Sequence, residues 1–148
     1  MERKILITGA NGQLGRAVIK HFSEDGWHTI GITSRRHDPK RDPIEAEAIY
    51  PCDLTSEEDV QAVFDNILGS NADVEAAAML AGGFAMGDIE STGMEQVEHM
   101  MGINFKTAYN CVRHITGIFK QNGGGHFIFI GARPALEPAS GQAMAGYA

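Results

Sequence analysis

The sequence predicts an α/β protein with a doubly wound parallel sheet: a single Rossmann-type, three-layer α/β/α domain over residues 1–148, truncated after its fifth strand. Three observations support this prediction. Short apolar runs alternate with amphipathic segments of helical length. The 18 glycines cluster instead of forming a repeat. The loops at 9–15, 81–87 and 131–147, which are candidates for ligand binding, each follow an apolar run. In such a sheet they would meet at the edge where ligands bind.

The first unit is a strand, a turn and a helix. The apolar run Lys4–Thr8 leads into a turn with glycines at positions 9, 12 and 15, and Gly26 marks the expected end of the following helix. These glycines permit a sharp turn and a close approach of the backbone to a pyrophosphate, which the amides and dipole of the helix would attract. A turn of this kind also simply joins strands to helices, so its context has to decide.

The middle of the chain predicts two more strands and a helix. A strand over Trp27–Thr33 precedes a polar, proline-interrupted loop at 34–47, and a short strand follows at about 46–50. The run Thr55-Ser56-Glu57-Glu58 predicts a capping box for a helix whose apolar stripe extends to Leu68.

The last predicted elements are two strands and one long helix. The small-residue run Val74–Leu80 is typical of a buried parallel strand and leads into a second glycine-rich loop. A capping box of Thr92 and Glu95 predicts a helix that continues unbroken to Asn122, and His126–Ile130 predicts the fifth strand.

Composition excludes several classes of protein. The chain has 148 residues and a formal net charge of −7, which argues against a nucleic-acid surface. No run reaches the ~20 apolar residues of a membrane span. The two cysteines lack C-x-x-C spacing and no secretory leader precedes them, which predicts a reduced, cytoplasmic protein. The six histidines are scattered without the spacing of metal ligands, which predicts no metal site.

These residues resemble the short-chain dehydrogenase/reductase family. The matching motifs are Thr8-Gly9-x-x-Gly12-x-x-Gly15, Asp53-Leu54 and Ala81-Gly82-Gly83. The resemblance implies that the glycine turn holds a dinucleotide, that Asp53 contacts the adenine, and that the 81–83 loop lines the cofactor. It also implies a homo-oligomer, either a dimer or a tetramer, which pairs through long helices.

The same resemblance implies the catalytic residues. Tyr147, in Gly146-Tyr147-Ala148, stands where the family's Tyr-x-x-x-Lys pair begins, and the partner Lys is expected at position 151. Such a Lys would lower the pKa of the tyrosine from about 10, so that it can act as a general acid. Asn104 matches an Asn that supports the active site, although it could equally be a satisfied buried polar group. We therefore expect the 148 residues alone to be inactive.

Two departures from the family pattern leave the substrate open. The turn has the T-G-x-x-G-x-x-G spacing of sugar-nucleotide-modifying relatives, and the usual Ser after the fifth strand is replaced by Gly131-Ala132-Arg133, with Ser140 too close to Tyr147. The missing Ser and the 80–84 loop resemble the dihydropteridine reductase branch, which works without that Ser. A site poor in hydroxyl groups would also fit a non-catalytic relative.

The end of the second strand predicts the cofactor. NAD-binding relatives place an acidic residue there for the ribose 2′-hydroxyl, whereas this chain has Thr33 followed by Ser34, Arg35 and Arg36. A hydroxyl and two guanidinium groups suit a 2′-phosphate, which predicts NADP(H) over NAD(H). The alternative is that the two arginines only solvate a charged loop.

The sequence thus predicts an NADP(H)-dependent oxidoreductase that acts on the carbonyl or hydroxyl group of a small, or pteridine-like, molecule. The alternatives are a non-catalytic dinucleotide-binding regulator and a sugar-nucleotide epimerase or reductase. For Asp53, a role at the start of the next helix is the competing interpretation. The expected cofactor-binding residues are Gly9, Asn11, Gly12, Gln13, Leu14, Gly15, Ser34, Arg35, Arg36, Asp53, Leu54, Ala81, Gly82 and Gly83.

Overall fold

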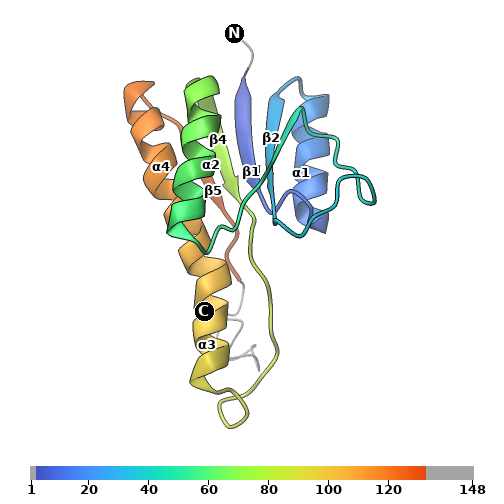
Figure 1. Cartoon of the computed structure of the whole chain (residues 1–148), viewed down its shortest axis with the longest axis vertical. Coiled ribbons are helices and arrows are strands. Elements are labelled where there is room, and N and C mark those ends of the chain that lie inside the picture. Colours follow the sequence, from blue (N-terminus) through green and yellow to red (C-terminus); the bar gives the residue numbers. More distant parts are fainter. Residues whose placement is uncertain (1–2, 133–148) are drawn as a thin grey trace.

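The computed structural model describes residues 3–132, which form a five-stranded parallel sheet in the order β3-β2-β1-β4-β5 (Figure 1). This order places β1 at the centre, with the chain moving outward first to one side and then to the other. The doubly wound parallel sheet predicted from the sequence is therefore confirmed. The strands are β1 (Lys4–Thr8), β2 (His28–Thr33), β3 (Ala48–Pro51), β4 (Val74–Met79) and β5 (His126–Phe129).

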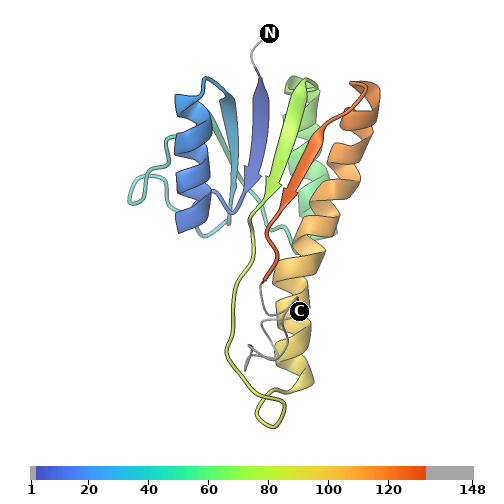
Figure 2. The same cartoon turned by 180° about the vertical axis from the view of Figure 1, so that it is seen from behind.

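Helices cover both faces of the sheet, as Figures 1 and 2 show. Helix α1 (Gln13–Glu24) packs on one face, where its Ile19 joins Ile5 and Ile7 of β1 in a fully buried cluster. Helices α2 (Glu57–Ser70) and α4 (Thr107–Gln121) cover the other face. Because side chains alternate along a strand, successive residues of β1 enter the two cores, which produces the three layers.

The long helix after β4 differs from its prediction in two ways. It begins with α3 (Met94–Met101) at the N-cap Gly93, not at Thr92, which instead ends the preceding turn: its amide donates to the Asp88 carbonyl at 3.0 Å. It is then interrupted by a π-helical segment, Gly102–Lys106, before α4 begins. The prediction of a Thr92–Glu95 capping box and an unbroken helix is therefore wrong.

The start of α2 is shifted by one residue from its prediction. Ser56 is the N-cap, and its hydroxyl accepts a hydrogen bond from the Asp59 amide at 3.3 Å. Thr55 lies one residue before the cap, and its amide and hydroxyl are both turned toward the Asp53 carboxylate, at 3.0 and 2.7 Å. The predicted helix is confirmed, but its capping residue is Ser56 and not Thr55.

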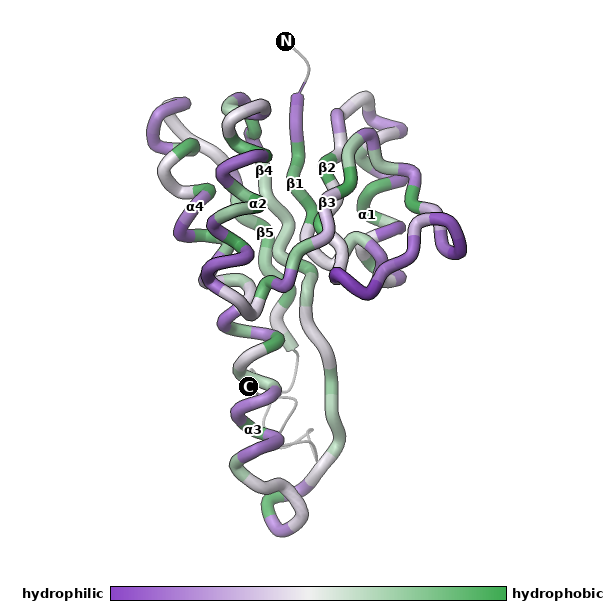
Figure 3. Tube along the Cα trace, in the orientation of Figure 1, coloured by the Kyte–Doolittle hydropathy of each residue, from purple (hydrophilic) through white to green (hydrophobic). Residues whose placement is uncertain are grey.

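The loop between β2 and β3 is the most hydrophilic connection near the sheet edge, as Figure 3 shows in purple. It is held against the start of α1 by Arg16, which donates to the Pro43 carbonyl at 2.7 Å and pairs with Asp42 at 2.5 Å. The later part of the loop that carries Arg35 and Arg36 is therefore held in place beside α1. Within residues 3–132, no helix is long and apolar enough to cross a membrane.

Candidate functional site

The turn after β1 is possible only with glycine at two of its positions. Gly9 has a φ of 65°, and a Cβ there would lie 2.9 Å from the Leu80 carbonyl oxygen. A Cβ on Gly15 would lie 2.2 Å from the carbonyl oxygen of Gly9, so the first turn of α1 sits directly on the turn backbone. Gly15 is thus a packing position and not a wall of the cleft described below.

Thr8, the last residue of β1, ties this turn to the end of β4. Its buried hydroxyl oxygen accepts hydrogen bonds from the amides of Leu80 and Ala81, each at 3.0 Å. These amides begin the loop after β4, where the sheet ladder no longer supplies them with partners. One hydroxyl therefore fixes the glycine turn after β1 and the glycine-rich loop after β4 relative to each other.

The N-terminus of α1 is left open. Its N-cap is Gly12, no side chain caps it, and no acidic residue occupies its first turn. The first amides of a helix have no partner within the helix, and the helix dipole favours an anion at that end. This end of α1 is therefore suited to bind a phosphate group.

A cleft of about 680 Å³ lies beyond the carboxyl ends of β1, β2, β3 and β4. It brings together residues that are far apart in the sequence, as expected for the edge of a doubly wound sheet. Ten of the residues expected to bind a cofactor line it: Gly9, Asn11, Gly12, Ser34, Arg35, Arg36, Asp53, Leu54, Ala81 and Gly82.

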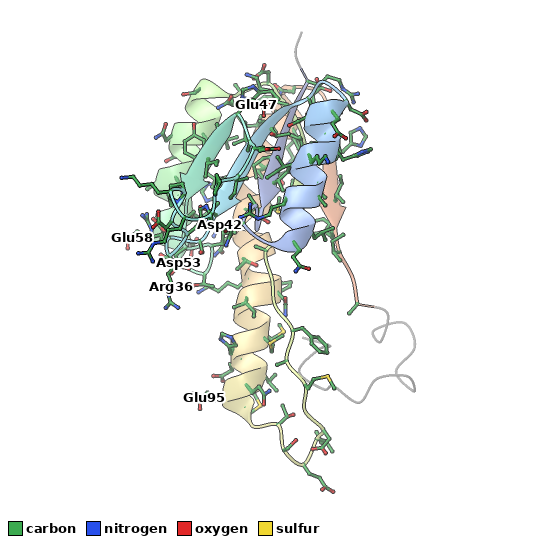
Figure 4. All side chains as sticks on the ribbon, turned by 90° about the vertical axis from the view of Figure 1, so that its right-hand side faces the viewer. Arg36, Asp42, Glu47, Asp53, Glu58 and Glu95 are labelled. Carbon is green, nitrogen blue, oxygen red and sulfur yellow. The ribbon has the colours of Figure 1, made fainter. Side chains whose placement is uncertain are left out.

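Burial and charge differ sharply along the β2 end of this cleft. The Thr33 hydroxyl is buried and has no hydrogen-bond partner within residues 3–132. Arg35 forms a forked ion pair with Asp59, with Nε to Oδ2 at 2.6 Å. Arg36 is exposed, forms no ion pair with any described residue and lines the same cleft as Asp53; both are labelled in Figure 4. The two arginines, for which the sequence predicts the same role, therefore differ in their contacts.

Asp53 lies in the cleft wall but also shapes the chain before α2. Its carboxylate accepts bonds from the amide and hydroxyl of Thr55, at 3.0 and 2.7 Å, and these bonds lower the pKa of the carboxyl below its ordinary value. The helix-start interpretation of Asp53 thus has direct geometric support. A contact with an adenine stays a prediction.

A second hollow of about 580 Å³ adjoins the first through Leu80, Ala81 and Gly82. Its lining is largely apolar and includes Leu14, Gly83 and Asn104. The Asn104 side-chain oxygen accepts a hydrogen bond from the Gly83 amide at 2.9 Å, and a Cβ on Gly82 would lie 2.5 Å from the same oxygen. Asn104 therefore holds the 81–83 loop close to the π-helical segment, and such segments occur frequently at functional sites.

Two further expected residues have other locations. Gln13 is exposed at the first position of α1 and lines neither hollow. Tyr147 lies outside the described residues, so its predicted catalytic role has no structural counterpart here.

Sequence reasoning missed three residues of this site. The motif that contains Thr8 does not indicate that its hydroxyl bridges two loops, Thr33 stands out only because it is not an acid, and the position of Asp59 suggests nothing beyond the first turn of a helix. No local pattern marks Asp59, because its partner Arg35 is 24 positions away. The two cysteines are free, as predicted, and the structure shows that both are buried. Burial raises the pKa of the Cys52 thiol in the cleft wall to about 12. The described residues contain no group of His, Cys, Asp and Glu that could hold a metal ion.

The parallel order, the two helical layers and the glycine turn define a Rossmann-type domain. The model of the short chain dehydrogenase family matches residues 3–147, which is nearly the whole chain. The chain therefore belongs to the short-chain dehydrogenase/reductase family.

Particular relatives sharpen this assignment. The chain is 30% identical over 147 residues to the dihydropteridine reductase of Dictyostelium discoideum, and the match covers 99% of this chain and 60% of that protein. A stretch of 51 residues is 47% identical to methionine adenosyltransferase 2 subunit beta of Mus musculus, which is 32% of this chain and 15% of that protein.

Solved structures agree with the fold. The structure of ElxO with NADP bound superposes with a TM-score of 0.84 at 20% identity, covering 92% of this chain and 58% of that one. The 3-ketoacyl-(acyl-carrier-protein) reductase from Brucella melitensis complexed with NADH gives a TM-score of 0.85 at 20% identity, covering 98% and 62%. The chain thus spans about 60% of the length of the dihydropteridine reductase and of these two solved structures.

Proposed function

We propose that this protein is an NADP(H)-dependent oxidoreductase that acts on a carbonyl or hydroxyl group of a small molecule, with a pteridine-like compound as the first substrate to test. The observation that carries the proposal is the make-up of the cleft. An uncapped helix N-terminus borders it at α1, while hydroxyl and guanidinium groups border it at the end of β2. The 30% identity to a dihydropteridine reductase supports the choice of substrate.

The residues of the cleft fit a dinucleotide with a 2′-phosphate. The turn at Gly9–Gly12 and the first amides of α1 would hold the pyrophosphate. Ser34, Arg35 and Arg36 would bind the ribose phosphate, because guanidinium groups donate charge-assisted, forked hydrogen bonds. The buried Thr33 hydroxyl offers a further unused donor beside them. NADP(H), when bound, supplies or accepts the hydride in this family.

The second hollow would hold the reacting end of the cofactor and the substrate. Asn104 fixes the Gly83 amide and with it the wall between the two hollows. We assign proton transfer to Tyr147, assisted by a Lys expected at position 151, which makes the tyrosine a general acid for the substrate oxygen. The apolar lining would exclude water from this end.

Cofactor titration tests the proposal. The dissociation constants of NADPH and NADH are measured for the protein by fluorescence, followed by turnover with a dihydropteridine and a panel of small carbonyl compounds. We expect NADPH to bind at least about tenfold more tightly, since each charge-assisted bond to the phosphate contributes about 1.5–3 kcal/mol. Equal affinities would refute the phosphate assignment.

A non-catalytic dinucleotide-binding regulator is the second candidate. The observation that favours it is the segment after β5, where Gly131 and Ala132 offer no hydroxyl to the second hollow that they line. Tight NADPH binding without turnover of any carbonyl substrate, and without a Lys at position 151 of the parent sequence, would favour the regulator.

A further inference from the structure

Directly behind Arg35 of the cleft wall lies an acidic side chain whose position the proposed function does not explain. Asp59, in the first turn of α2, holds Arg35 through both oxygens, with Nε to Oδ2 at 2.6 Å. Only 16% of the Asp59 side chain is exposed, against 56% for Arg35. The carboxylate is thus the fixed partner, and the guanidinium is the group that it holds.

Asp59 is itself held by the chain that follows β3 and by the N-cap of its own helix. Its Oδ2 accepts a hydrogen bond from the Asp53 amide at 2.7 Å, at the end of β3, and its own amide donates to the Ser56 hydroxyl at 3.3 Å. Arg35 follows β2, so this one carboxylate joins the ends of two strands to the start of α2. Two of its partners, Arg35 and Asp53, line the cleft.

The shape of a guanidinium group explains what this arrangement leaves available. Asp59 occupies the edge formed by Nε and Nη2, so the second edge, formed by Nη1 and Nη2, retains its donors. A free arginine side chain loses considerable rotamer freedom on binding an anion, and one that is already held loses less. Phosphate is bound best by such a forked edge.

We propose that Asp59 is a positioning residue for cofactor discrimination, which holds Arg35 at the cleft wall with one guanidinium edge directed to bind the 2′-phosphate of the cofactor. This inference rests on the proposed binding of NADP(H). It assigns to Asp59 a part in the choice between NADP(H) and NAD(H), although Asp59 itself does not contact the phosphate.

The test uses 2′,5′-ADP and 5′-AMP as probes, because they differ by the 2′-phosphate alone and need no turnover. Both dissociation constants are measured by calorimetry for the native protein and for Asp59→Asn. We expect Asp59→Asn to weaken 2′,5′-ADP binding by about fivefold and to leave 5′-AMP binding unchanged, because a neutral amide loses the forked pair. Glu58→Gln is the matched control, since it removes a neighbouring exposed charge of α2 that forms no ion pair with a described residue.

A double-mutant cycle with Arg35→Ala separates positioning from simple structural support. The single variant Arg35→Ala loses more 2′,5′-ADP affinity than Asp59→Asn, and adding Asp59→Asn to it produces no further loss. Arg35→Lys keeps the positive charge but lacks the forked guanidinium group, so we expect it to lose as much 2′,5′-ADP affinity as Asp59→Asn. If Asp59→Asn does not fold, Arg35→Lys provides the test.

Three results would overturn the inference while leaving NADP(H) binding intact. These are tighter 2′,5′-ADP binding by Asp59→Asn, an equal loss for both probes, and undiminished affinity in Arg35→Lys. If the native protein binds 2′,5′-ADP no more tightly than 5′-AMP, the proposed NADP(H) preference itself fails.

Discussion

Two helix N-termini at the same edge of the sheet are built in opposite ways. Helix α2 is capped by Ser56 and has three acidic residues in its first turn, Glu57, Glu58 and Asp59. Helix α1 has glycine at its N-cap, no side-chain cap and no acidic residue in its first turn. Both helices follow a parallel strand, so their place in the fold does not explain the difference.

The contrast indicates what each helix end does. Side-chain oxygens and carboxylates satisfy the free amides and the dipole of α2, which stabilises the helix from within the chain. The same groups are missing at α1, where the amides stay available and the chain accepts a less stable helix end. At this edge of the sheet, the end of α2 is therefore built for stability, whereas the end of α1 leaves its amides available to a ligand. Each of the following predictions tests this difference.

The largest expected effect is that of Gly15→Ala. The new Cβ would lie 2.2 Å from the Gly9 carbonyl oxygen and 2.9 Å from Ala10 Cα, both backbone atoms that cannot move without opening the turn. We expect the free energy of unfolding to fall by about 3 kcal/mol or more, measured by urea denaturation.

Gly117→Ala is the matched control for that variant. Gly117 also lies within a helix, α4, but a Cβ there meets no atom within 4 Å. Alanine should leave the stability unchanged or raise it by up to about 1 kcal/mol, owing to its higher helix propensity. Similar losses in both variants would contradict the close packing of α1 on the glycine turn.

The second effect concerns charge at the open helix end. Gln13→Glu gives α1 an acidic first turn like that of α2, and the side chain lies outside the cleft lining, so it does not block a ligand sterically. We expect NADPH affinity to fall by about tenfold through repulsion of the pyrophosphate, while the helix gains about 0.3–1 kcal/mol. Fluorescence titration and urea denaturation measure the two quantities. Unchanged NADPH affinity would mean that the anion does not bind at α1.

A smaller effect is expected from removing the cap of α2. Ser56→Ala deletes the acceptor of the Asp59 amide and should lower the free energy of unfolding by about 1 kcal/mol. Ser56→Asp restores an acceptor and a favourable charge, so its stability should return to at least that of the native protein in the same denaturation experiment. No recovery with Asp would argue that Ser56 acts through packing and not as a cap.

The smallest effect is a dependence of stability on pH. The hydrogen bond from Arg35 lowers the pKa of Asp59 below its ordinary value of 3.8. Because the unfolded chain takes up the proton first, the ion pair contributes stability above that value and loses it as the pH falls through the folded-state pKa. The pair is partly exposed, so its contribution is under about 1 kcal/mol. Denaturation between pH 7 and 3 should show a shallower acid loss in Asp59→Asn than in the native protein, and identical slopes would rule out the contribution.

Local patterns predicted most of the elements because their causes are local. Apolar periodicity identified all five strands, and glycine spacing located the turn after β1. Predictions of caps were weaker: Thr55 and Thr92 fit the capping pattern, but the N-caps are the next residues, Ser56 and Gly93. The Thr55 hydroxyl bonds to Asp53, and the Thr92 amide closes the turn that begins at Asp88. Neither apolar periodicity nor a capping pattern indicates the π-helical segment that contains Asn104.

The sequence by itself determined the five strands, the glycine turn after β1 and the polar loop after β2, since each depends on residues within a few positions. Only the tertiary structure decided the different contacts of Arg35 and Arg36, the link from Asn104 to the Gly83 amide, and the bridging by Thr8. These contacts join residues 21 to 73 positions apart. Their partners are set by how parallel strands align at one edge, which no local pattern encodes.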